Sequence, residues 1–122
     1  MNTALWVTQA LLALAFLGAG SMKLMKTRAE LIAMPPMGWA EDFSANTIKL
    51  IGVAEIAGAL GVILPTVTGV LPMVTSVAAG GLVLVMLGAA ATHIKRSEMG
   101  SVPPTLVLMG LSAFVAYGQF VA

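Results

Sequence analysis

Apolar residues fill most of this chain in four long stretches, which shorter polar segments separate. The stretches cover about residues 4–22, 47–64, 70–92 and 103–121. A helix needs about 20 apolar residues to cross a hydrocarbon core of roughly 30 Å, and each stretch is close to that length. The pattern therefore predicts an all-α integral membrane protein whose four transmembrane helices form a bundle.

Residues suited to helix ends flank these stretches. Candidate N-caps precede the second, third and fourth: Ser44 or Asn46, Thr68, and Ser101. Pro65 is expected to close the second helix, and three other prolines suit first helical turns: Pro72, Pro103 and Pro104. Thr27 to Phe43 is the longest interruption, and we expect it to be a partly embedded loop. No segment is long enough to separate domains, so residues 1–122 are expected to form a single domain.

Basic residues lie in only two of the connecting segments. The six Lys and Arg residues are Lys23, Lys26, Arg28, Lys49, Lys95 and Arg96. Because basic loops favour the cytoplasmic side, segments 23–46 and 93–101 are expected to be cytoplasmic and both termini outside. The membrane is expected to be a bacterial-type inner or plasma membrane. Residues 1–3 carry no basic side chain, so the first stretch is read as a retained helix rather than a signal peptide.

Composition narrows the function classes. Hydrophobic residues make up 59% of the chain and charged residues 9%, which is too few charges for an ordinary water-exposed surface. The net charge of +1 argues against nucleic acid as a partner. Since the chain has no Cys, it has no disulfide, thiolate nucleophile or iron–sulfur site. A single His excludes a bis-His haem within one chain, so we expect no metal site and no intrinsic cofactor.

Four side chains are candidate anchors at the membrane interface. Trp6 and Tyr117 lie near the expected outer ends of the first and fourth helices, where aromatic belts form. Trp39 lies in the embedded loop, and Lys49 is placed so that its amine extends to the cytoplasmic headgroups. The second and third helices are rich in Gly and Ala, which makes them the best candidates for the bundle interior.

Glu55 is the most informative residue in the sequence. It follows Thr47 by eight positions, which places it about 12 Å into the membrane at 1.5 Å per residue. A carboxylate there must face inward and find a partner. Helical side chains lean toward the helix N-terminus, so Lys23, His93 and Glu55 are expected to converge in the inner third of the bundle. They are candidates for ligand binding and proton relay; alternatively, Lys23 and Glu55 form a purely structural ion pair and His93 is merely interfacial.

The same residues carry a family resemblance. Residues Gly18-Ala19-Gly20-Ser21-Met22-Lys23-Leu24 end the first helix, Glu55 follows in a Gly/Ala-rich helix, and His93 closes the third. This pattern, over nearly the whole chain, resembles the DoxX-like family of small four-helix membrane proteins. The family takes its name from a small subunit of an archaeal thiosulfate:quinone oxidoreductase, and distant relatives resemble assembly chaperones. The resemblance implies that Lys23, Glu55 and His93 carry any shared function.

Three functions remain open. The most concrete is an accessory, non-catalytic membrane subunit linked to quinone-dependent redox, in which the polar residues bind a quinone headgroup or another small ligand. The second is an assembly or scaffold protein without ligand chemistry, and the third is a proton-coupled carrier for a small solute. The chain alone is not expected to be an enzyme. Besides the lipid bilayer, the sequence leaves open a redox partner subunit or a homodimer.

Overall fold

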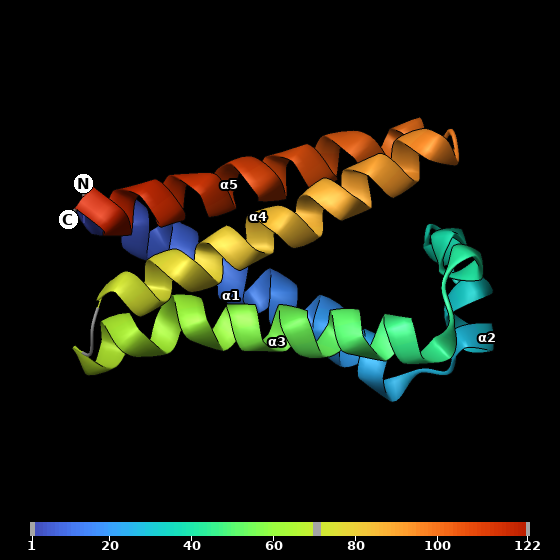
Figure 1. The fold of residues 1–122 in the computed structure, drawn as a ribbon, viewed down its shortest axis with the longest axis horizontal. Coiled ribbons are helices and arrows are strands. Elements are labelled where there is room, and N and C mark those ends of the chain that lie inside the picture. Colours follow the sequence, from blue (N-terminus) through green and yellow to red (C-terminus); the bar gives the residue numbers. More distant parts are fainter. Residues whose placement is uncertain (1, 70–71, 122) are drawn as a thin grey trace.

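The computed structural model describes residues 2–69 and 72–121, and these contain four long helices and no strand (Figure 1). The long helices are α1 (Asn2–Met25), α3 (Ala45–Thr68), α4 (Pro72–Lys95) and α5 (Val102–Val121). Each contributes a segment long and apolar enough to cross a membrane. The prediction of an all-α, four-helix transmembrane bundle is therefore confirmed.

The helices are arranged as two pairs that pack against each other. α1 packs along α3 and α4 along α5, while α3–α4 and α1–α5 contacts join the pairs. α1 begins and α5 finishes at the same end of the bundle, on the left in Figure 1. We call this the terminal end. The opposite end is called the basic end, because the six Lys and Arg residues lie in or beside its connections.

The observed helix ends correct the expected boundaries at several points. α3 does not stop at Pro65 but continues to Thr68, and Gly69 ends it in the left-handed conformation, with φ of 73°. In hydrocarbon the backbone must satisfy its own hydrogen bonds, so a helix continues past a proline where water would allow it to break. Thr68, expected as an N-cap, instead closes α3 by donating to the carbonyl of Leu64 at 2.8 Å.

The other ends differ by smaller amounts. α1 extends to Met25, and α3 begins at Ala45, where the side chain of Ser44 accepts from the N–H of Thr47 at 3.2 Å. α5 begins at Val102, after the 3-10 helix η2 (Met99–Ser101). The expected start of the third helix at residue 70 lies outside the described residues, and α4 is described from residue 72.

The long connection between α1 and α3 is more ordered than the loop expected there. It contains the short helix α2 (Arg28–Ile32) and the 3-10 helix η1 (Met37–Asp42). The side chain of Thr27 accepts from the N–H of Glu30, whose carboxylate accepts from the N–H of Thr27, which is a capping box. Leu31, Ala40 and Ile48 form a small apolar core of their own. η1 is thereby held across the basic end of the bundle.

Glycine allows α1 and α3 to approach closely. A Cβ atom at Gly20 would lie 2.7 Å from the carbonyl oxygen of Gly52, and one at Gly52 would lie 2.9 Å from that of Gly20. Backbone blocks both positions, so only glycine fits. At Gly80, Gly81 and Gly88 of α4 an added Cβ would meet none of the described residues within 4 Å. The expectation that the small residues of α3 and α4 mark the bundle interior therefore holds for only part of them.

A network of neutral polar side chains joins the helices near the terminal end. Gln9 of α1 donates to the carbonyl of Val62 at 2.6 Å and to the hydroxyl of Thr66 at 2.9 Å, both on α3. Gln119 of α5 donates to the side-chain oxygen of Gln9 at 2.8 Å, and Thr66 lies 3.2 Å from Thr75 of α4. The network thus includes all four long helices, and nothing in the sequence pattern predicted it.

Candidate functional site

The amine of Lys23 and the carboxylate of Glu55 form an ion pair between α1 and α3. Lys23 Nζ lies 2.8 Å from Glu55 Oε1, and the two residues are 6% and 2% exposed. Lys23 stands in the last turn of α1 and leans back into the bundle, while Glu55 leans from α3 toward the basic end. The Gly20–Gly52 contact lets them meet, because a Cβ at Gly52 would lie 3.0 Å from that of Lys23.

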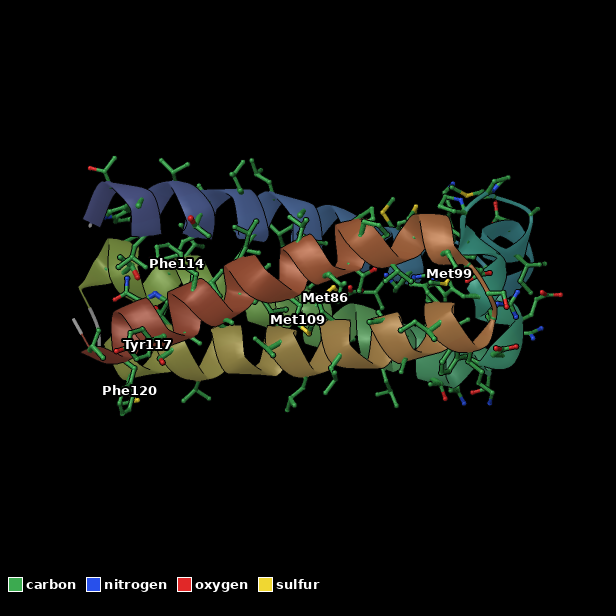
Figure 2. All side chains as sticks on the ribbon, turned by 90° about the horizontal axis from the view of Figure 1, so that it is seen from above. Met86, Met99, Met109, Phe114, Tyr117 and Phe120 are labelled. Carbon is green, nitrogen blue, oxygen red and sulfur yellow. The ribbon has the colours of Figure 1, made fainter. Side chains whose placement is uncertain are left out.

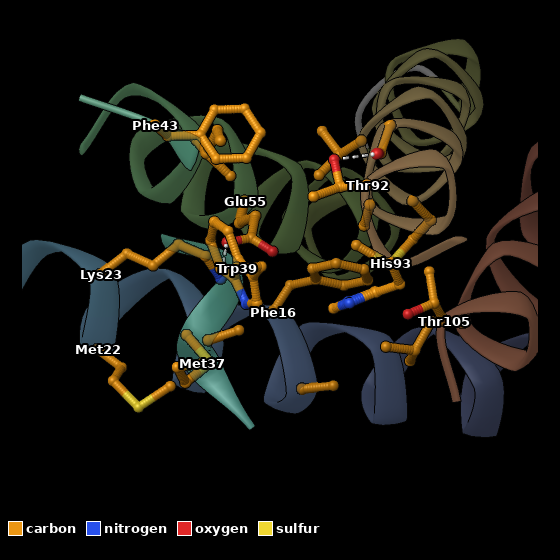
Figure 3. Close-up of a pocket in the computed structure, with 18 of the residues that line it drawn as sticks. Phe16, Met22, Lys23, Met37, Trp39, Phe43, Glu55, Thr92, His93 and Thr105 are labelled. Atoms are coloured by element: carbon orange, nitrogen blue, oxygen red, sulfur yellow. Dashed lines mark hydrogen bonds and ion pairs between the residues drawn. The ribbon is translucent and has the colours of Figure 1, made fainter. Parts of the chain in front are cut away.

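This pair leaves hydrogen-bonding capacity unused. Glu55 Oε1 is sealed from solvent and, although close to the ammonium, has no partner in hydrogen-bond geometry among the described residues. In Figure 3 one carboxylate oxygen faces Lys23 and the other points away from it. An ammonium has three donors and a carboxylate has about four acceptor positions, so one contact satisfies neither group. The pair can therefore bind a further polar group.

Aromatic side chains from the η1 segment cover the pair. Lys23 Nζ lies 5.5 Å from the ring centroid of Trp39, within the range of a cation–π interaction. Trp39 meets Phe43 edge to face, with centroids 5.7 Å apart. Trp39, expected only as an interfacial anchor, is thus also part of the wall around the charged pair.

A cavity of about 490 Å³ lies beside the pair (Figure 3). Its walls are largely apolar and include Phe16 of α1 together with Trp39 and Phe43. Leu84 and Gly88 also line it from α4, and both are exposed on the molecular surface, Leu84 by 68%. The cavity therefore extends to the surface that faces lipid. It combines one charged pair with apolar walls, as small-molecule sites commonly do.

His93 lines this cavity but has a different partner from the one expected. Its Nδ1 lies 2.9 Å from Oε1 of Glu98, just beyond the end of α4. Arg96 Nε donates to the other oxygen of Glu98 at 2.9 Å, while its two terminal nitrogens contact Glu41 and Asp42 of η1 at 2.9 and 2.8 Å. The hydrogen bond from His93, reinforced by the Arg96 guanidinium, holds the pKa of Glu98 below its usual range.

The three candidate site residues thus line one cavity, with Lys23 and Glu55 paired and His93 bonded elsewhere. Their roles in ligand binding and proton relay stay predictions. Among the expected anchors, Lys49 is exposed and donates to the carbonyl of Leu24 at 3.3 Å. Trp6 and Tyr117 are 41% and 69% exposed, and Figure 2 shows Tyr117 near the terminal end.

Sequence reasoning missed two charged residues at the site, Arg96 and Glu98. The charge pattern marks Arg96 only as a basic loop residue and does not single out Glu98. Their spacing did carry a signal, since His93, Arg96 and Glu98 fall within six positions at a helix end. Phe16, which is 1% exposed, was hidden in an unbroken apolar run. Within residues 2–69 and 72–121 no three His, Cys, Asp or Glu side chains are grouped so as to hold a metal ion.

Comparison with known proteins agrees with this architecture. The model of the DoxX-like family matches residues 7–115, which include Lys23, Glu55, His93 and the other cavity residues described above. The chain belongs to the DoxX-like family. No curated protein and no solved structure matches the chain. The family assignment and the four apolar helices together make this protein a multi-pass integral membrane protein in contact with the lipid bilayer.

Proposed function

We propose that this protein is an accessory membrane subunit linked to quinone-dependent redox, and that its cavity binds a quinone headgroup or a small ligand of the same chemistry. The observation that carries the proposal is the buried Lys23–Glu55 pair with unused hydrogen-bonding capacity beside a cavity of about 490 Å³. A charge pair serving only as a helix contact gains nothing from such a cavity, and apolar residues would replace it at no loss of stability.

The residues present fit a quinone headgroup. Its carbonyl oxygens need hydrogen-bond donors, and the ammonium of Lys23 has donors to spare. Its flat ring suits a space between aromatic side chains such as Phe16 and Trp39. Its apolar tail fits an opening toward lipid at Leu84. A bound quinone would supply two-electron redox chemistry, and the electrons would be exchanged with a partner subunit.

The chain's own residues bind, orient and exclude water in this proposal. Lys23 donates to a carbonyl oxygen, and Glu55 holds the ammonium in place while keeping an acceptor position for a proton. Trp39 and Phe43 limit the access of water from the basic end. We further propose that the basic end is cytoplasmic and both termini are outside, as the positive-inside tendency favours. The single variants Ser97→Cys and Thr68→Cys of this Cys-free chain, both at exposed positions and probed with an impermeant maleimide, test that orientation.

Binding of decylubiquinone to the purified protein in nanodiscs tests the site. The wild type is expected to bind it saturably, and the double variant Lys23→Met/Glu55→Leu is expected to lose at least about tenfold in affinity, which corresponds to about 1.4 kcal/mol. Because the double variant leaves no unpaired charge, it is expected to fold. Lys49→Met, which removes an exposed lysine outside the cavity, is the matched control. Equal binding by wild type and double variant would refute the proposal.

An assembly or scaffold role is the second candidate. It is favoured by Gly81 and Gly110, which are exposed and where an added Cβ would meet nothing within 4 Å. Small residues on membrane helices allow close contact with another helix, and these two serve no such contact among the residues that the structure describes. Gly81→Leu should then reduce recovery of a co-purifying partner without changing the protein's own stability. Unchanged recovery would count against this role. The carrier function has no comparable observation in its favour.

A further inference from the structure

A second hollow lies on the other side of His93 from the cavity. It is a groove of about 710 Å³ at the basic end, lined in part by Pro35, Pro104 and Glu98. Four residues line both the groove and the cavity: Met37, Trp39, His93 and Thr105. These four residues therefore form the partition that separates the cavity, which lies among the membrane helices, from the groove at the basic end.

His93 and Glu98 form a contact through this partition. Glu98 lines the groove but not the cavity, and its side chain is 24% exposed. Its Oε1 accepts from His93 Nδ1 at 2.9 Å, while Arg96 holds Oε2. The N–H of Glu98 also donates to the carbonyl of His93 at 2.8 Å, so backbone and side chain fix the same arrangement. Arg96 is in turn anchored on η1 by Glu41 and Asp42.

The second ring nitrogen of His93 is available on the cavity side. Nε2 has no hydrogen-bond partner among the described residues and is not sealed from solvent. Figure 3 shows the ring extending from α4 toward Phe16, across the cavity from Lys23. With an ionised Glu98 as acceptor, Nδ1 carries the ring proton and Nε2 is a free acceptor. The charged groups that share the cavity with this nitrogen are Lys23 and Glu55.

We propose that Glu98 and His93 connect the membrane cavity to the aqueous groove as a proton-transfer site. In the step from cavity to groove, Nε2 takes a proton from a donor in the cavity, and the Nδ1 proton passes to Glu98 and then to groove water. The ring is then neutral again, with its proton on Nε2 instead of Nδ1. Reorientation of the ring restores the starting arrangement. One proton enters and one leaves, with no electrons moved. Glu98 both orients the ring and carries the proton between Nδ1 and groove water, and the step runs in reverse for uptake.

This inference rests on the proposed function for its purpose, since a headgroup that is reduced or oxidised must gain or lose protons. The geometry favours a relay over a purely structural bond in one respect. A structural bond would need only one ring nitrogen, and the other could be buried against apolar side chains. Here Nδ1 is bonded to a carboxylate that lines the groove, while Nε2 has no partner among the described residues in a ring that also lines the cavity.

The single histidine of the chain makes a direct test practical, because ¹⁵N-histidine labels only His93. In liposomes, the wild type is expected to show a protonated Nδ1 and a bare Nε2, and both signals should respond reversibly when the bulk pH is changed, because groove water reaches Glu98. Glu98→Gln introduces an amide that donates to Nδ1, so the proton should move to Nε2. Glu41→Gln, which keeps the Glu98 contact, is the matched control and should leave the signals unchanged.

Two results would overturn the inference: signals that do not respond to bulk pH, or the same tautomer in wild type and Glu98→Gln. Decylubiquinone then separates this inference from the proposed function. If it binds, Nε2 is expected to shift while Nδ1 stays in place, and an unmoved Nε2 would refute the cavity side of the path. If decylubiquinone does not bind, the proposed function fails, and the proton-transfer site stands or falls on the pH and tautomer results alone.

Discussion

The polar groups inside the two ends of the bundle differ in charge and in how fully they are satisfied. Near the terminal end they are neutral, and Gln9, Thr66 and Gln119 hydrogen-bond to one another or to backbone. Near the basic end they are ionisable, and Lys23 and Glu55 border a cavity with bonding capacity left over. Both ends join helices, but among the buried side-chain oxygens and nitrogens of the described residues, the one without a hydrogen-bond partner is Glu55 Oε1, toward the basic end.

This difference supports the proposal that the binding site lies at the basic end. Hydrogen bonds between neutral side chains suffice to join helices in a membrane, as the terminal end demonstrates. Charged groups are more costly to bury, so their presence at the basic end calls for a use beyond helix contact. The cavity, the aromatic cover of Trp39 and Phe43, and the second hollow beyond His93 all lie at that same end.

The largest expected effect comes from separating the charged pair. Glu55→Leu leaves the Lys23 ammonium buried without a partner, and the free energy of unfolding is expected to fall by about 3–5 kcal/mol. Lys23→Met/Glu55→Leu removes both charges and is expected to stay within about 1 kcal/mol of the wild type. Chemical unfolding in detergent micelles measures both. A single variant no less stable than the exposed control Glu41→Leu would show that the pair is not buried as described.

A smaller effect is expected from disturbing the approach that positions the pair. Gly20→Ala places a Cβ 2.7 Å from the Gly52 carbonyl oxygen, and overpacking of this kind costs about 1–3 kcal/mol. Gly18→Ala, two residues earlier on α1 in open space, is the matched control. The same unfolding assay should separate the two variants. Equal stabilities would mean that α1 and α3 are farther apart than described.

The polar network near the terminal end is expected to support stability but not ligand binding. Gln9→Leu removes hydrogen bonds to Val62, Thr66 and Gln119, and bonds of this kind are worth about 0.6 kcal/mol each on average in a membrane protein. A loss of about 1–2 kcal/mol in unfolding free energy is expected, with decylubiquinone binding unchanged. Should Gln9→Leu weaken binding as much as the Lys23/Glu55 double variant, the two ends would not be functionally distinct.

The smallest effect is a pH dependence at the basic end. Because the pKa of Glu98 is lowered in the folded protein, its contribution to stability is present above the ordinary carboxyl value of 4.5 and is lost as the pH falls below it. The contacts that hold η1 through Arg96 should then loosen. Trp39 fluorescence in a Trp6→Phe background should report this loosening. Glu98→Gln should remove the part of the acid transition that comes from Glu98. An identical acid transition in both proteins would contradict the assignment.

The sequence predicted the architecture because four apolar stretches of membrane length allow few other folds. The approach of Lys23 to Glu55 could be predicted from the direction in which helical side chains lean. A buried carboxylate also needs a partner, and few cations are within its reach. The course of α3 past Pro65 was predicted wrongly because the rule for helix ends assumes water. In hydrocarbon there is no water to bond the N–H and C=O groups that a broken helix would expose, so the helix continues.

Other features were beyond prediction from one sequence. The Gln9–Gln119 contact joins residues 110 positions apart, and glutamines near helix ends also occur where they only meet headgroups. The His93–Glu98 bond depends on a tight turn, in which Ser97 has a φ of 59°. That turn directs Glu98 back toward the bundle. Neither contact follows from hydrophobic pattern or from charge counts.

Photo-crosslinking with an azido-quinone in nanodiscs tests the central claim most directly, because mass spectrometry then locates the headgroup. Labelling is expected on the cavity residues Phe16, Trp39 or Phe43, and Lys23→Met/Glu55→Leu should abolish it while leaving the bundle folded. Labels spread over exposed, lipid-facing positions such as Leu14 and Val77, in wild type and double variant alike, would show that the charged pair does not form a binding site.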